Sequence, residues 1–116
     1  MLPAKPGRKP VEFVGESLRA LRSFPESAKR KAGYQLALLQ DGNEPSDWKP
    51  MAAVGSGACE LRIRDESGAY RVVYVAKFKA AIYVLHCFEK RTQKTPLNDI
   101  AIAKNRYKQI VKENSA

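Results

Sequence analysis

The chain has 116 residues, of which 44% are hydrophobic, so it is long enough to form one compact domain around a single core. Lysine and arginine number 21 against 12 aspartates and glutamates, which gives a net charge of +9 and attracts nucleic acid, anionic lipid or an acidic protein. A basic surface can also serve solubility alone. The sequence has no apolar run near the roughly 20 residues that cross a membrane, and its N-terminus lacks the apolar region of a secretory signal.

The N-terminal half of the chain predicts an arm, one short strand and two helical segments. Pro25 suits the first position of a helix, because the N–H that it lacks needs no partner there. After Pro25, apolar residues recur at steps of three and four as far as Asp41-Gly42, which is the pattern of an amphipathic helix. The expected elements are a flexible basic arm at residues 1–10, a strand at Val11–Val14, one or two helical turns within Gly15–Ser23, a helix from Pro25 to Asp41 and a loop at Asn43–Gly57.

The C-terminal half predicts three strands followed by one helix. In Ala58–Arg64, apolar residues alternate with charged ones, so one face of this strand is expected to contact water. The third strand is almost entirely apolar and is expected to lie at the centre of the sheet. Thr95-Pro96 suits the start of the final helix, whose apolar stripe includes Leu97 and Val111. The expected elements are strands at Ala58–Arg64, Tyr70–Lys77 and Ala81–Phe88 and a helix from Pro96 to about Glu113.

The order of these elements predicts an α+β fold. Short connections between consecutive strands favour an antiparallel meander with helices packed on one face. We therefore expect a small antiparallel sheet of about four strands, with two N-terminal helices and a C-terminal helix packed on it. Residues 1–116 contain no internal repeat and are expected to form a single domain.

Most of the usual catalytic and cofactor sites are excluded by the residues present. There is one histidine, His86, and the two cysteines, Cys59 and Cys87, are too far apart to form a metal-binding pair. They are expected to be reduced core residues of a cytoplasmic protein. His86 and Cys87 are neighbours on a predicted strand, so they point to opposite faces and cannot act as a catalytic pair. The GSG at Gly55–Gly57 lacks the lysine and helix of a phosphate-binding loop, so no cofactor and no metal are expected.

Cations remain as the candidate chemical groups. Arginine binds two phosphate oxygens at once, and its fixed charge offsets the negative charge that builds up during phosphate chemistry. RNA cleavage can proceed without metal, because the nucleophile is the 2′-OH of the substrate itself. Cations alone are thus chemically sufficient for a ribonuclease, and they are equally typical of a surface that only binds RNA. The basic residues on or beside the predicted sheet are Lys49, Arg62, Arg64, Arg71, Lys90 and Arg91.

Three segments in a fixed order carry a family resemblance. ELRIRDESGAYRVVY is followed by IYVLHCFEKRTQKTP and by a helix that opens LNDIAIAKNR. This combination, between Lys49 and Lys108, resembles the phage-derived HigB/RelE-like toxins of bacterial type II toxin–antitoxin modules. The resemblance implies a RelE-like fold and a cytoplasmic endoribonuclease that cuts translated mRNA on the ribosome. It also implies a partner, a helix-turn-helix antitoxin that binds the toxin in a hetero-oligomer.

The resemblance also implies roles for four cations. Arg71 of YRVVY matches the arginine that stabilises the phosphate. Arg91, with Lys90 beside it, matches the cations that support phosphate or leaving-group chemistry after the last strand. Lys49 matches a basic residue that helps the 2′-OH to attack. The catalytic residues are therefore expected to be Arg71, Arg91, Lys90 and Lys49.

The sequence departs from some relatives near the C-terminal end. Where those relatives use a tyrosine or a histidine as acid or base, this chain has Thr92, Gln93 and Leu97. The identity of the proton donor is therefore open, and lysines could serve. Further contacts to RNA are expected from Arg62, Arg64, Lys79, Lys94 and Trp48.

Other interpretations of the same residues stay open at this point. Arg71 could be a sheet arginine paired with Glu60 or Asp65, and Arg91 and Lys94 could be ordinary solvated cations before a helix. The chain could then be a basic RNA-binding module, or a phage-derived protein that kept the fold without catalytic activity. His86 is expected to be a hydrogen-bonded core residue.

Overall fold

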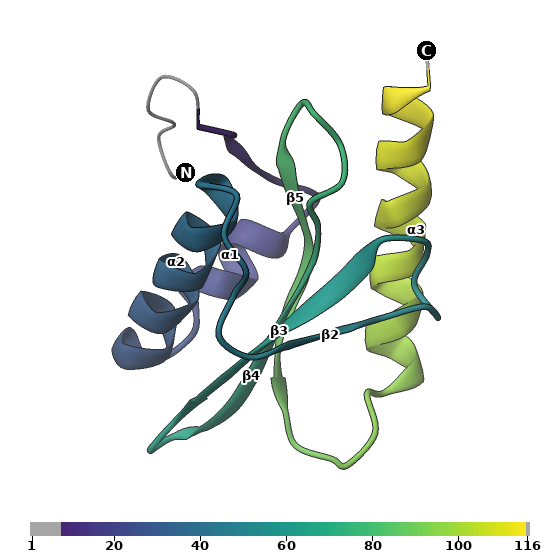
Figure 1. Cartoon of the computed structure of the whole chain (residues 1–116). Coiled ribbons are helices and arrows are strands. Elements are labelled where there is room, and N and C mark those ends of the chain that lie inside the picture. The colour runs from purple at the N-terminus through teal and green to yellow at the C-terminus, as the bar shows by residue number, and fades with distance from the viewer. Residues whose placement is uncertain (1–7, 116) are drawn as a thin grey trace.

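A five-stranded mixed sheet is the middle layer of the computed structural model, which describes residues 8–115 (Figure 1). Most of the expected flexible arm, residues 1–7, lies outside the described part of the chain. The strands are arranged in the order β1-β5-β4-β3-β2. The elements are β1 (Val11–Phe13), α1 (Ser17–Arg22), α2 (Glu26–Gln40), β2 (Trp48–Pro50), β3 (Ala58–Asp65), β4 (Gly68–Val75), β5 (Ile82–Lys90) and α3 (Leu97–Asn114).

The structure confirms the predicted α+β class and the three predicted long strands. Two features of the sheet were not predicted. β2 lies within the expected loop, where it pairs antiparallel with β3 through the register Lys49↔Glu60. Pro50 is tolerated in β2 because this strand is at the edge of the sheet. β1 pairs parallel with β5, as its long connection to the rest of the sheet allows. The sheet is therefore mixed and has five strands.

The helices cover both faces of the sheet, so the expectation of helices on one face is wrong (Figure 1). On one side, α1 and α2 bury Leu21, Ala32 and Leu36 against Leu61 and other residues of the sheet. On the other side, residues of α3, among them Ala103 and Ile110, pack against a separate cluster from β3, β4 and β5. Two apolar layers result, because β4 and β5 carry apolar side chains on both of their faces.

The apolar stripe of α3 is shorter than expected. Ala103 and Ile110 are buried, whereas Leu97 is 84% exposed and Val111 is 36% exposed. Both ends of α3 nevertheless contact β5, where Asp99 Oδ1 lies 2.7 Å from His86 Nε2 and Asn114 Nδ2 donates to the hydroxyl of Tyr83 over 3.1 Å. Within residues 8–115, the helices are too short or too polar to cross a lipid bilayer.

A β-bulge at Leu85 changes the face on which the residues of β5 lie. Val73 pairs with His86, while the next residue, Tyr74, pairs with Val84, so Leu85 has no partner on β4. The carbonyl oxygen of Leu85 instead accepts a hydrogen bond of 2.8 Å from Arg106 Nη1 on α3. Before the bulge, odd-numbered residues of β5 face α3; after it, even-numbered residues do. The end of β5 therefore presents Phe88 and Lys90 on the α3 side.

The segment before β1 contacts the end of α2 and the residue that follows β4. Arg8 Nε donates to Asp41 Oδ1 over 2.6 Å, and Lys9 Nζ donates to the carbonyl oxygen of Ala76, also over 2.6 Å. Gln40 Nε2 donates in turn to the carbonyl oxygen of Lys9. Residues 8–10 are thus joined to the end of α2.

Candidate functional site

The α3 side of the sheet contains a buried carboxylate, Glu60 on β3. Its side chain is 0% exposed, although the alternation in the sequence predicts that it contacts water. Glu60 Oε1 lies 3.6 Å from Lys49 Nζ on β2 and 3.6 Å from Arg71 Nε on β4. Burying an unpaired charge costs several kcal/mol, and the two cations offset the cost of burying this carboxylate.

Arg71 is itself almost completely buried, at 3% exposure, beside Glu60. Its Nη1 atom donates to the carbonyl oxygen of Tyr70 over 3.1 Å. Burial lowers the pKa of Arg71, and the charge of Glu60 opposes that shift. A guanidinium stays charged at any physiological pH, so Arg71 is a fixed positive charge under the surface of the sheet.

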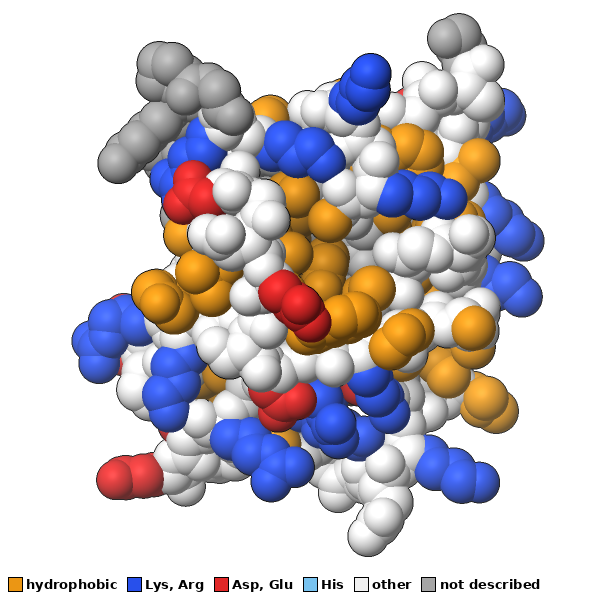
Figure 2. Space-filling view, viewed as in Figure 1, with side chains coloured by type: hydrophobic (Ala, Val, Ile, Leu, Met, Phe, Trp, Pro, Cys, Tyr) orange, Lys and Arg blue, Asp and Glu red, His pale blue; other side chains and the backbone are white. Residues whose placement is uncertain are grey.

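A hollow of about 470 Å³ opens over Arg71. We call it the basic cleft. It lies between the hairpin that joins β3 to β4 and the segment that leads into α3, where Lys and Arg side chains gather across the lower part of Figure 2. It is lined by Arg62, Arg64, Ala69, Arg71, Lys90, Arg91, Thr92 and Gln93.

Lys90 enters the basic cleft because of the bulge in β5. It pairs with Ala69 at the end of the β4–β5 ladder and is half-buried. Partial burial lowers the pKa of Lys90, and the nearby charge of Arg71 lowers it further. A lysine with a lowered pKa gives up its proton more readily, so Lys90 is the better suited of these cations to transfer a proton.

Arg62 and Arg64 form the wall of the cleft on the side of β3. Arg62 lies directly across the ladder from Arg71, and the charges of Arg62 and Arg64 lower the pKa of Arg71. Among residues 8–115, Arg62 Nε is buried and has no hydrogen-bond partner. Arg64 is exposed to the solvent. Together with Lys90, these side chains surround Arg71 with positive charge that an anion could neutralise.

Three other predicted site residues, Arg91, Lys94 and Lys79, lie at the rim of the cleft or outside it. Arg91 borders the cleft, but its side chain is 80% exposed and its Nη2 atom pairs with Glu89 over 2.9 Å. Lys94 is exposed in the segment before α3. Lys79 is exposed in the β4–β5 connection, at the opposite end of the sheet from the hairpin of β3 and β4.

Trp48 lies on the other face from the cleft. It is partly buried against the core under α1 and α2, and its Nε1 atom donates to Glu44 over 2.9 Å. A base bound in the basic cleft would therefore not stack on this ring.

His86 and Cys87 lie on opposite faces, as expected. His86 is a core residue whose Nε2 atom lies 2.7 Å from Asp99 Oδ1 in the first turn of α3, and its ring stacks on Phe88. Cys87 belongs to the other core, where burial raises the pKa of its thiol to about 12. The pair cannot act as nucleophile and base.

The sequence offers Glu60 as one of two possible partners of Arg71, and the structure places Glu60 Oε1 3.6 Å from Arg71 Nε, but the burial of Glu60 was not expected. The burial of Glu60 depends on β2, which lies within the segment predicted to be a loop. Because Lys49 on β2 lies across from Glu60, the strand covers the carboxylate and supplies one of its two counter-charges.

The fold and this site define a small α+β protein with a cationic cleft, supported by one buried carboxylate, on a face of its sheet. Residues 19–108 match the family model described as phage derived protein Gp49-like (DUF891), and the chain belongs to that family. No curated protein matches the chain.

Proposed function

We propose that this chain is the toxin of a type II toxin–antitoxin module and that it cleaves mRNA on the ribosome without a metal ion. The observation that carries the proposal is the basic cleft, in which a buried arginine is surrounded by Arg62, Arg64 and Lys90. The membership of a phage-derived family and the resemblance of ELR, YRVVY and the basic segment before α3 to HigB/RelE-like toxins support it.

The proposed reaction uses the RNA's own 2′-OH. The 2′-OH loses its proton to water, helped by the positive charge of Lys49, and the 2′-oxygen bonds to the adjacent phosphorus. The bond from phosphorus to the 5′-oxygen breaks, and that oxygen takes a proton from Lys90, which leaves a 2′,3′-cyclic phosphate and a 5′-hydroxyl. Arg71 stabilises the charge that develops on the phosphate, an effect typically worth about 10²–10³-fold in rate. Arg62, Arg64 and Arg91 bind the neighbouring phosphates.

Glu60 is a positioning residue in this scheme. It is fully buried, so it does not touch RNA, and it lies 3.6 Å from both Lys49 Nζ and Arg71 Nε. Its charge holds the two cations on one face of the sheet while their other donors are available to the phosphate. The carboxylate also offsets part of the repulsion between Arg71 and the cations around it.

The proposal includes a protein partner and a location. The antitoxin would be a helix-turn-helix protein that covers the basic cleft with acidic groups or a helix, since the positive field attracts such a surface. The toxin would act in the cytoplasm, where translated mRNA is available.

The test is induced expression in a bacterial host without antitoxin, with protein levels matched between variants. Wild type should arrest growth and produce new, translation-dependent 5′ ends in mRNA, as seen by primer extension. Arg71→Ala should do neither, and Arg71→Lys, which keeps the charge beside Glu60 but lacks the planar fork, should retain partial activity. Lys79→Ala, an exposed cation far from the cleft, should behave as wild type.

Three outcomes would count against parts of this proposal. Normal growth with a folded wild-type chain would argue against a nuclease. Arrest by Arg71→Ala would keep a toxin but move its site elsewhere. Cleavage products that carry a 5′-phosphate instead of a 5′-hydroxyl would argue against attack by the 2′-OH.

A second candidate is an RNA-binding module without chemistry. The lining of the basic cleft favours it, because its described residues supply cations, a hydroxyl and an amide but no histidine, tyrosine or carboxylate that could accept a proton. In that case Arg71→Ala should weaken RNA binding and lower its salt dependence by about one phosphate contact, with no cleavage to lose. Under the nuclease proposal, most of the binding should remain and cleavage should disappear.

A further inference from the structure

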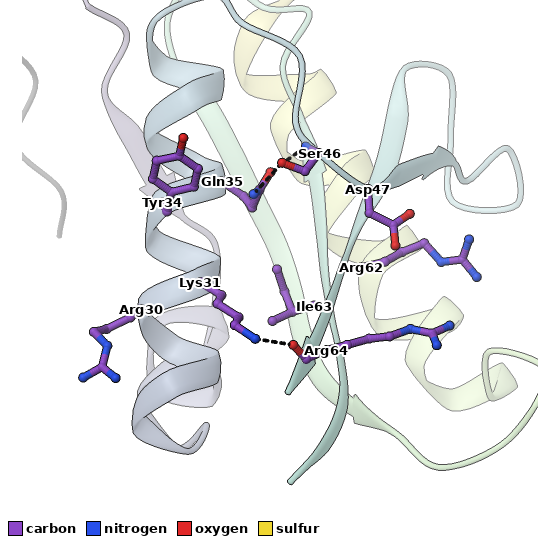
Figure 3. A pocket seen from close by; sticks show the side chains of 9 residues that line it. All are labelled: Arg30, Lys31, Tyr34, Gln35, Ser46, Asp47, Arg62, Ile63 and Arg64. Atoms are coloured by element: carbon purple, nitrogen blue, oxygen red, sulfur yellow. Dashed lines mark hydrogen bonds between the residues drawn. The ribbon is translucent and has the colours of Figure 1, made fainter. Parts of the chain in front are cut away.

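A second hollow lies across β3 from the basic cleft, between this strand and α2 (Figure 3). We call it the α2–β3 groove; its volume is about 370 Å³. Lys31 and Tyr34 stand on its helix wall, Ile63 lies in its floor and Arg62 and Arg64 belong to its strand wall. The proposed reaction makes no use of this groove.

The groove exists because β2 is too short to cover β3. The last hydrogen bond between β3 and the segment of β2 runs from Arg62 N to the carbonyl oxygen of Asp47 over 2.9 Å. Two residues further on, the carbonyl oxygen of Arg64 accepts a hydrogen bond of 2.7 Å from Lys31 Nζ. A lysine side chain from α2 thus occupies the backbone position that an added strand would need, which disfavours pairing with a peptide at this edge.

The groove has an exposed aromatic ring. Tyr34 is 63% exposed, which is a large fraction for an aromatic side chain, and α2 presents it at the mouth of the groove. Its ring can lie flat against a nucleobase, because stacking on an aromatic face accepts any base. Inside the groove, Ile63 and the stem of Lys31 add an apolar surface under such a base.

The groove and the basic cleft share a wall. Arg62 and Arg64 line both hollows, and Figure 3 shows their side chains extending from β3 away from α2. Within residues 8–115, neither arginine side chain has a carboxylate within 4 Å, and Arg30 on α2 has none either. Asp47 is the one carboxylate among the described lining residues of the groove. A polyanion leaving the cleft over β3 therefore meets free positive charge on both sides of the strand.

We propose that the α2–β3 groove is a second subsite for single-stranded RNA, in which an unpaired base stacks on Tyr34 while Arg64 and Arg30 bind the flanking phosphates. The occupant is the stretch of RNA that continues from the basic cleft over β3. The inference rests on the proposed function, because that proposal identifies the polymer as RNA. It concerns binding and not cleavage.

The test is direct binding of the full chain to labelled single-stranded RNA whose 2′-hydroxyls are methylated, so that cleavage cannot occur. An oligonucleotide of about 12 nucleotides should reach both hollows, and one of about 4 should fit the cleft alone. Tyr34→Ala should weaken binding of the long oligonucleotide on the order of 5- to 100-fold and leave the short one unchanged. Tyr34→Phe should bind as wild type. Tyr34→Ala should leave the salt dependence unchanged, whereas Arg64→Ala should reduce its slope by about one contact.

A base requirement separates stacking from simple attraction of charge. The effect of Tyr34→Ala should disappear when the long oligonucleotide lacks its bases but keeps its phosphates. Equal binding of wild type and Tyr34→Ala to the long RNA would overturn the subsite, and so would a loss that is the same for both lengths. A variant that binds RNA as wild type but fails to bind an acidic partner protein would assign the groove to that partner and overturn the RNA proposal.

These outcomes do not depend on the nuclease. A chain that shows no cleavage in cells but loses binding of the long RNA on Tyr34→Ala would keep the subsite and reject the enzyme. A chain that cleaves mRNA and binds the long RNA independently of Tyr34 would do the reverse.

Discussion

Arg71 Nε lies 3.6 Å from Glu60 Oε1, and both side chains are almost completely removed from solvent. Among residues 8–115, neither that nitrogen nor the two oxygens of Glu60 have a hydrogen-bond partner. The attraction is therefore one of charge across a short gap rather than of two well-formed hydrogen bonds. Such a pair keeps its partners in place only while both charges are present.

Removing the charge of Glu60 should destabilise the fold. Glu60→Gln leaves the buried guanidinium of Arg71 without its counter-charge, and breaking a buried pair costs about 3 kcal/mol. Urea denaturation should show this loss in the free energy of unfolding. The double variant Glu60→Gln, Arg71→Met should be more stable than Glu60→Gln alone, since it leaves no unpaired charge. A Glu60→Gln variant as stable as wild type would mean that the pair does not hold the sheet together.

Lys90 should control the alkaline side of the cleavage reaction. Its pKa is lowered from 10.5 by burial and by Arg71, so the protonated form that donates to the 5′-oxygen is lost at a lower pH than for a free lysine. Cleavage in a purified translation system should therefore fall as the pH rises through this lowered pKa. Lys90→Arg, which keeps the charge and holds its proton, should cleave on the order of 10²-fold more slowly with RNA binding retained.

A pH profile of Lys90→Arg that falls at the same pH as wild type would assign the proton donor to another group. RNA binding should be followed alongside cleavage, because lost binding in Lys90→Arg would point to a role in holding the phosphate instead.

Asp65 should give the fold an acid-sensitive contribution. Hydrogen bonds from Ser27 and Ser67 lower the pKa of Asp65 from 3.8 to about 2. Because the folded-state pKa is depressed, the stabilisation is fully present above pH 3.8 and is lost as the pH falls toward 2. Asp65→Asn should flatten this part of the curve of unfolding free energy against pH. Glu66→Gln, an exposed residue of the same turn that has no ion pair among residues 8–115, is the control for simple removal of one negative charge.

Gly55 and Gly33 should respond to alanine in opposite directions. A Cβ atom on Gly55 would overlap the ring of Tyr107 on α3, so Gly55→Ala should lower the free energy of unfolding by roughly 1–3 kcal/mol. A Cβ atom on Gly33, inside α2, meets nothing within 4 Å. Gly33→Ala should therefore stabilise the protein by about 0.5–1 kcal/mol. Thermal and urea unfolding of the two variants would check both signs, and a stabilising Gly55→Ala would show that the segment before β3 moves aside easily.

The helices and the long strands could be predicted because their signals are local. The three- and four-residue steps of α2 and the alternation in β3 reflect contacts made by single elements. β2 could not be predicted, since three residues with a proline carry no periodic signal and become a strand only through pairing with β3. The faces covered by the helices depend on the same long-range packing, so the expectation of one covered face was wrong.

The candidate site was predictable as a set of residues but not as an arrangement. Arg62, Arg71 and Lys90 gather in one cleft, whereas Lys79 and Trp48 lie away from it. Nothing in the sequence separates these groups, because the separation depends on which end and which face of the sheet each residue occupies. The burial of Glu60 could not be predicted for the same reason, since it follows from the strand across from it.

The extra residue at Leu85 determines how this chain can be compared with its relatives. The bulge exchanges the two faces of β5 midway, so Lys90 is on the α3 side only because the strand is one residue longer than its partner requires. In a homologue without that extra residue, an ungapped alignment would put in the column of Lys90 a residue that projects toward α1 and α2 instead. Equivalence of cations at the end of this strand therefore has to be judged after gaps are assigned, and an unchanged amino-acid identity there does not by itself imply a shared role.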